Sequence, residues 1–269
     1  MENKHKQQKK PKIVSKPFLR GSAIDSHLGM DSLRFFGTLI IMAVIYLLLS
    51  TVLMFDSLLL RVTINLAVAL AAHLLFYTSG ITKGTSAVNL GEMLYLRKDS
   101  GHAVPEKELQ ACYHPLKGFM QALVGSLPLF VCAVLLAITA QVQTTGLSAL
   151  PSWLSGYESR AEIGNALLYY HEVVPMGVEG VTRLIVRICL MPFVTLIGTD
   201  NPQGLLLLEH LSPLVVLLPA LFYGVGYTQG VAMRAKVHTS IATNDRKRAK
   251  KEKKRREAKL KTHTPEQLN

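Results

Sequence analysis

Four polar residues lie in otherwise apolar segments of this sequence, where they could line a binding or transport site. Asn65 and His73 are eight positions apart, about 80° around a helix, so their side chains share one broad face. Arg183 and Arg187 are spaced i,i+4, which also puts them on one helical face. Such residues either bond to neighbouring helices or line a pathway for a proton or solute.

The packing role is favoured for Asn65 and His73, because no carboxylate within the apolar segments is a partner for His73. For Arg183 and Arg187 the two interpretations are anchoring at the membrane interface and binding of an anionic lipid headgroup or solute.

The most basic stretch of the chain is residues 245–261, with the sequence DRKRAKKEKKRREAKLK. Its residues favour a helix, but apart from Leu260 it has no apolar stripe. Three roles are open: setting the membrane topology, adhesion to anionic phospholipid, and neutralisation of RNA phosphates. Without interleaved aromatic residues, any RNA contact would be sequence-nonspecific. The residues predicted to make these contacts are Arg246, Lys247, Arg248, Lys250, Lys251, Lys253, Lys254, Arg255 and Arg256.

Catalytic and metal-binding patterns are weak throughout the sequence. The three cysteines, Cys112, Cys132 and Cys189, form no CxxC pair and no zinc-like spacing with histidine. His171 and Glu172 begin a zincin-like pattern, but Pro175 stands where the second histidine is required. We therefore expect a protein that is not an enzyme, with no catalytic residue, no metal and no cofactor.

Long apolar runs must position these residues. The chain has 269 residues, of which 49% are hydrophobic, and a mean hydropathy of +0.27. Apolar runs at 35–55 and 58–77 are each long enough to cross a bilayer, and Asp56-Ser57 between them can only reverse the chain. Two further apolar runs follow, at about 119–140 and 213–233. The sequence thus predicts an all-α, polytopic integral membrane protein with four transmembrane helices in two hairpins.

Residues 184–198 form an apolar run of only fifteen residues, with Arg187 near its start and Pro192 in its middle. An arginine deep in the bilayer costs about 2.5–3.5 kcal/mol on the insertion scale. We expect this run to be an interfacial or re-entrant helix on the outer side. The predicted division is a basic cytoplasmic arm (1–34), transmembrane hairpin 1 (35–80), a cytoplasmic loop with short helices (81–117), transmembrane helix 3 (118–142), an outer segment with the interfacial helix (143–211), transmembrane helix 4 (212–233) and a basic cytoplasmic tail (234–269).

The charge distribution predicts the orientation. The net charge is +12, and 26 of the 30 Lys and Arg residues lie in 1–34, 81–117 and 234–269. Basic residues stay on the cytoplasmic side, so both termini are expected in the cytoplasm and the protein in the plasma membrane.

Tyr77–Ile81 and Tyr227–Val231 match in part, either by chance or as a trace of a hairpin repeat. Gly226 and Gly230 form a small-xxx-small pair that permits close helix contact.

These features favour a scaffold or regulator of a membrane-protein partner. The alternative is a component of a small-solute or lipid transporter lined by Asn65, His73, Arg183 and Arg187. The third hypothesis is a membrane-tethered protein whose basic tail binds anionic phospholipid headgroups or RNA.

Overall fold

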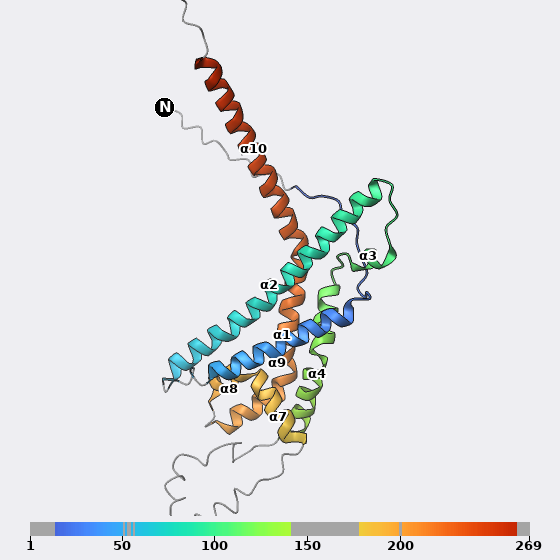
Figure 1. The fold of residues 1–269 in the computed structure, drawn as a ribbon. Coiled ribbons are helices and arrows are strands. Elements are labelled where there is room, and N and C mark those ends of the chain that lie inside the picture. The colour runs from blue at the N-terminus through green and yellow to red at the C-terminus, as the bar shows by residue number, and fades with distance from the viewer. Residues whose placement is uncertain are drawn as a thin grey trace, which may run out of the picture.

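The computed structural model describes residues 14–50, 52, 55, 57–140, 178–198 and 201–262, with side chains to residue 258. The described ranges contain helices and no strand, which confirms the all-α prediction for this part of the chain (Figure 1). In chain order the helices are α1 (Leu28–Ser50), α2 (Leu58–Asp99), α3 (Glu106–Ala111), α4 (Lys117–Thr139), α7 (Val178–Cys189), α8 (Met191–Ile197), α9 (Pro202–Thr228) and α10 (Gly230–Thr262).

Four helices are long and apolar enough to cross a membrane: α1, α2, α4 and the helix that begins with α9. Their outward faces carry large aliphatic side chains, such as Ile41, Leu48, Leu70 and Leu214, which are all exposed. Exposed apolar surface on this scale is typical of helices that face lipid. The helices are therefore compatible with a multi-pass membrane protein.

The short apolar run at 184–198 is not one straight helix. It is divided between α7 and α8, whose axes are bent by 90° at Leu190. Pro192 lies in the first turn of α8, where its missing N–H is tolerated at a helix start but would interrupt a continuous helix. A sharp bend of this kind occurs in broken spans and in re-entrant loops, so the interfacial or re-entrant helix stays a prediction.

Several element boundaries differ from the predicted division. Helix α1 begins and ends earlier than the predicted first span. Helix α9 begins within the predicted outer segment. Residues 143–177 of that segment lie outside the described residues. Helix α2 runs without a break through Gly80 and Gly84 to Asp99, into the predicted loop. Glycine has a low helix propensity, but both of these glycines are buried against α9, and tertiary packing outweighs that propensity. Residues 1–13 of the predicted arm also lie outside the described part.

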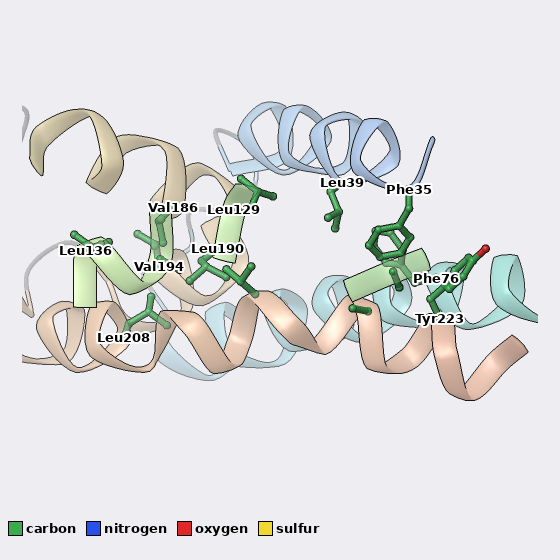
Figure 2. Packing of buried hydrophobic residues seen from close by; sticks show 14 of the residues in the cluster. Phe35, Leu39, Phe76, Leu129, Leu136, Val186, Leu190, Val194, Leu208 and Tyr223 are labelled. Carbon is green, nitrogen blue, oxygen red and sulfur yellow. The ribbon is translucent and has the colours of Figure 1, made fainter. Parts of the chain in front are cut away.

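Helix α9 is the centre of the bundle. It packs between α2 and α4, while α1 covers α4, and α7 and α8 close one end (Figure 1). The apolar core follows α9 along its length. At one end Phe35 of α1 packs at a tilt against Phe76 of α2 and edge to face against Tyr223 of α9, with ring centroids 5.6 and 5.1 Å apart (Figure 2). The α3 end of the bundle also holds the extended C-terminal part of α2 and the start of α10 (Figure 1).

Glycines let α2 and α9 meet backbone to backbone. A Cβ on Gly80 would collide with the carbonyl oxygen of Tyr223, and one on Gly226 with the carbonyl oxygen of Tyr77. Gly230 lies against the backbone of Gly84 in the same way. The close contact predicted for Gly226 and Gly230 is confirmed, and the partly matching segments that contain Tyr77 and Tyr227 pack against each other at this crossing.

Candidate functional site

The predicted basic residues all lie exposed on one long helix. Only Gln229 separates the end of α9 from the start of α10, and Pro202–Ala258 forms a helical run of 57 residues. The nine predicted contact residues between 246 and 256 are exposed. Figure 1 shows α10 leading away from the bundle beyond the ends of α1 and α4. The basic stretch is therefore held as a projecting helix.

A buried cluster ties the base of α10 to α2. Glu92 of α2 accepts from Arg234 Nη2 through Oε2 at 2.9 Å and lies 2.7 Å from His238 Nε2 through Oε1. Burial on its own raises the pKa of the Glu92 carboxyl, but the hydrogen bonds and charges of Arg234 and His238 outweigh it and hold that pKa below its ordinary value of 4.5. The ionised carboxylate thus fixes the direction in which α10 leaves the bundle.

The described start of the chain reaches the same place. The backbone N–H of Val14 donates to Thr239 Oγ1 of α10 at 3.1 Å, and the N–H of Leu19 donates to the carbonyl of Gly91 on α2. The N–H of Gly21 donates to the carbonyl of Tyr113, which follows α3. From Val14 onward, the N-terminal segment therefore lies across α10, α2 and the end of α3.

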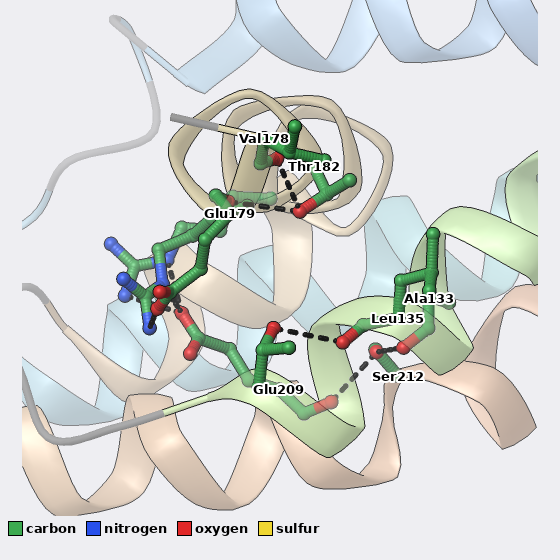
Figure 3. A network of polar contacts seen from close by, with 10 residues as sticks. Ala133, Leu135, Val178, Glu179, Thr182, Glu209 and Ser212 are labelled. Carbon is green, nitrogen blue, oxygen red and sulfur yellow. Dashed lines mark hydrogen bonds and ion pairs between the residues drawn. The ribbon is translucent and has the colours of Figure 1, made fainter. Parts of the chain in front are cut away.

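Arg183 and Arg187 share one carboxylate. Arg183 Nε lies 3.0 Å and Arg187 Nη2 2.6 Å from Glu209 Oε1 of α9, and Glu179 Oε1 is 3.2 Å from Arg183 Nη2. Figure 3 shows Glu209 pointing toward the α7 residues from α9, with Ser212 bonded to the carbonyl of Ala133 on α4. Glu209 could not be identified as their partner from the sequence, because it lies 26 positions from Arg183 and shares no helix with it.

Asn65 and His73 each have other partners. Asn65 donates to the carbonyl of Arg61 at 2.8 Å and accepts from Thr195 Oγ1 of α8 at 2.7 Å. His73 Nδ1 lies 2.6 Å from the carbonyl oxygen of Ala69, and its ring meets Phe222 of α9. A cavity of about 40 Å³ adjoins His73, enough for a water molecule but not for a larger solute. The four predicted polar residues are thus held in three places with different partners.

Sequence reasoning missed a polar cavity at the α3 end of the bundle. Five residues define this polar cavity here: Asp25, Asp31, Lys83, Lys117 and Gln121. Lys117 Nζ is 2.6 Å from Asp25 Oδ2, and Lys83 Nζ is 3.0 Å from Asp31 Oδ1. In the sequence the two lysines count only as topogenic charges, and their partners lie 52 or more residues away. The available signal was the i,i+4 pair of Lys117 and Gln121 at the start of an apolar run.

The described residues offer little support for metal binding or thiol chemistry. Among them, no group of three or more His, Cys, Asp or Glu side chains is arranged to hold a metal ion. Cys112, Cys132 and Cys189 are free, and burial is the main cause that raises the pKa of the Cys112 thiol, which disfavours the reactive thiolate.

No family model matches the chain, and no curated protein or solved structure is significantly similar to it. Functional inference for this chain therefore rests on the arrangement of its own residues.

Proposed function

We propose that this chain is a plasma-membrane protein with four transmembrane helices and both termini in the cytoplasm, and that it scaffolds an RNA-containing partner on α10. The orientation is supported by the charge distribution, since 26 of the 30 Lys and Arg residues lie in the three segments assigned to the cytoplasm. A scaffold needs a surface for its partner outside the bilayer, and α10 supplies it.

The observation that carries the proposal is the continuation of α9 into α10. Arg246 lies thirteen residues beyond Met233, the end of the last apolar run, which is about 20 Å along a helix. The headgroup layer on each side of a bilayer is about 5–8 Å thick. Beyond this layer, surface charge is screened within about 8–10 Å at physiological salt. A projecting α10 therefore places its charges where a soluble partner can reach them.

RNA suits this helix better than a lipid surface does. A helix that lies on a membrane needs an apolar face, and between residues 246 and 258 the only apolar residues are Ala249 and Ala258. Basic residues surround the helix instead, which is suited to phosphates that approach from several directions. Val14 of the N-terminal segment lies beside Thr239 of α10, and Lys16 follows two residues later with a further positive charge.

RNA binding by the full chain tests the proposal. The protein is placed in nanodiscs of neutral phosphatidylcholine and titrated with a mixed-sequence single-stranded oligoribonucleotide at several salt concentrations. We expect the double variant Lys250→Gln with Lys254→Gln to bind more weakly and to lower the slope of log affinity against log salt by about 1.4, since each lost phosphate contact removes about 0.7.

The matched control is Lys98→Gln with Lys107→Gln, which removes two exposed positive charges from α2 and α3. This control is expected to keep wild-type affinity and slope. Equal RNA binding by both double variants and the wild type would contradict the proposal. Loss of RNA binding in nanodiscs with anionic lipid would assign α10 to the membrane surface instead.

A further inference from the structure

The polar cavity has the size and position of a ligand site. Its volume is about 300 Å³, at the lower end of the range of small-molecule pockets. The N-terminal segment and helices α1, α2, α3, α4 and α9 all contribute to its lining. Lys117, Asp25 and Gln121 form a buried floor, with 2–4% of these groups exposed. Lys83 and Arg34 form an open rim, with side chains 43% and 68% exposed.

Two acceptor atoms on the floor have no hydrogen-bond partner within the described part of the chain. Asp25 binds Lys117 through Oδ2, while its Oδ1 is buried and unpartnered. Gln121 donates from Nε2 to Asp31 Oδ2 at 3.1 Å, while its Oε1 is buried and unpartnered. Turning the Gln121 amide over would place its oxygen against the Asp31 carboxylate, so the hydrogen-bond network fixes which amide atom is the nitrogen and which is the oxygen. Buried acceptors of this kind are stabilised when a small side-chain rotation lets a donor from the adjoining cavity reach them.

A primary ammonium is the donor that fits these two oxygens. It carries three N–H groups and a positive charge, which suits one carboxylate oxygen and one amide oxygen together. A divalent metal ion fits poorly, because it needs about six oxygen ligands and Lys117 occupies the same floor.

The rim selects an anionic group on the same ligand. Lys83 and Arg34 both contact Asp31, at 3.0 and 3.3 Å, so two cations share one carboxylate. With Arg34 of the rim and Lys117 and Asp25 of the floor included, the lining of the cavity holds three positive and two negative side chains. An ammonium has three donors and a guanidinium five, so both rim residues can hold Asp31 and an anion at the same time.

We propose that the polar cavity binds a small zwitterion, whose primary ammonium donates to Asp25 Oδ1 and Gln121 Oε1 and whose phosphate or carboxylate lies between Lys83 and Arg34. The helices α1 and α4 begin beside the cavity, at Leu28 and Lys117, so it lies at the level where these spans enter the membrane. Both a free solute and the headgroup of phosphatidylethanolamine have this chemistry and reach this level. This proposal does not depend on RNA binding by α10.

Calorimetry on the full chain in nanodiscs of phosphatidylcholine tests the site. The probes are phosphoethanolamine and phosphocholine, which differ in that the quaternary ammonium of phosphocholine has no N–H donor. Phosphoethanolamine is expected to bind at least tenfold more tightly than phosphocholine. The variant Lys83→Gln is expected to lose at least fivefold in affinity for phosphoethanolamine, while Lys98→Gln on the same helix keeps wild-type affinity.

The variant Gln121→Met removes one acceptor and should abolish the preference for phosphoethanolamine, with folding checked by circular dichroism. Native mass spectrometry separates the two sources. If the headgroup is the ligand, the wild type retains phosphatidylethanolamine more than Lys83→Gln does, and this lipid blocks phosphoethanolamine. If a free solute is the ligand, phosphoethanolamine binds equally with and without the lipid. No binding of phosphoethanolamine, together with equal lipid retention by the wild type and Lys83→Gln, would overturn the proposal.

Discussion

Arg183 Nε lies 3.0 Å from Glu209 Oε1, with 1% of one side chain and 3% of the other exposed. Arg187 contacts the same carboxylate oxygen from the next turn of α7, at 2.6 Å. One carboxylate thus neutralises part of the charge of two arginines and joins α7 to α9. Two residues that could have formed an anion site are instead engaged in an ion cluster inside the protein.

Replacing Glu209 with Gln should destabilise the fold strongly. The change leaves two arginines side by side without their shared counterion, and removing one partner of a buried ion pair costs about 3–5 kcal/mol. The free energy of unfolding is measured by SDS titration in mixed micelles. The control is Glu179→Gln, which removes a half-exposed carboxylate from the same Arg183 and should cost under about 1 kcal/mol. Equal losses in the two variants would contradict the prediction.

The close crossing of α2 and α9 predicts that adding a single methyl group there will lower stability strongly. Gly226→Ala places a Cβ against the carbonyl oxygen of Tyr77, so the two backbones must separate, at a cost of about 1–3 kcal/mol. Gly37→Ala on α1 is the matched control, because a Cβ there meets nothing within 4 Å. It should be neutral or stabilising, since alanine favours a helix over glycine. The same SDS titration compares them, and similar stabilities would argue against the close crossing.

The bond between Asn65 and Thr195 predicts a smaller effect. Thr195→Val keeps the side-chain shape but leaves buried Asn65 Oδ1 without its donor, which costs about 1–3 kcal/mol. Thr63→Val removes an exposed hydroxyl that bonds only within its own helix, and should change stability by less than about 0.5 kcal/mol. If Thr63→Val costs as much as Thr195→Val, the bond between α2 and α8 contributes nothing.

The Glu92 cluster predicts an acid-sensitive α10. Because the folded state lowers the pKa of Glu92, its contribution is fully present above pH 4.5 and is lost as the pH falls through the lower, folded value. Spin labels at Lys98→Cys and Asn244→Cys, without the native cysteines, report the distance between α2 and α10. The wild type should give a narrow distribution at pH 7 that broadens only below pH 4.5. Glu92→Gln should be broad at every pH from 7 to 4, and a narrow distribution in this variant would contradict the role of the carboxylate.

Local patterns in the sequence predict the helices well. Four apolar segments, the spacing of Gly226 and Gly230, and the helix-favouring residues of the tail each act within a few turns of one chain. The continuity of α2 is different, because Gly80 and Gly84 act as contact points only when α9 is present. Similarly, the bend at Leu190 was not apparent from Pro192 alone, which also fits a kink or a helix start.

The polar sites could not be predicted, because their partners are distant in the sequence. Asp31 binds Lys83 and Gln121, which lie 52 and 90 positions away, and Glu92 binds His238 across 146 positions. A single sequence gives the charge of each residue but not which opposite charge faces it. Helix packing decides which charges face each other. It brings residues that were counted as topogenic charges together as the floor and rim of the polar cavity.

The bond from Val14 to Thr239 joins residues 225 positions apart. During synthesis Val14 leaves the ribosome early, and its acceptor Thr239 is made only after most of the polypeptide. Formation of this hydrogen bond is therefore among the last events of assembly. A chain truncated before Thr239 would lack it and would keep only the bonds of Leu19 and Gly21 to Gly91 and Tyr113. The complete set of contacts around the N-terminal segment therefore forms only after α9 and the start of α10 have been synthesised.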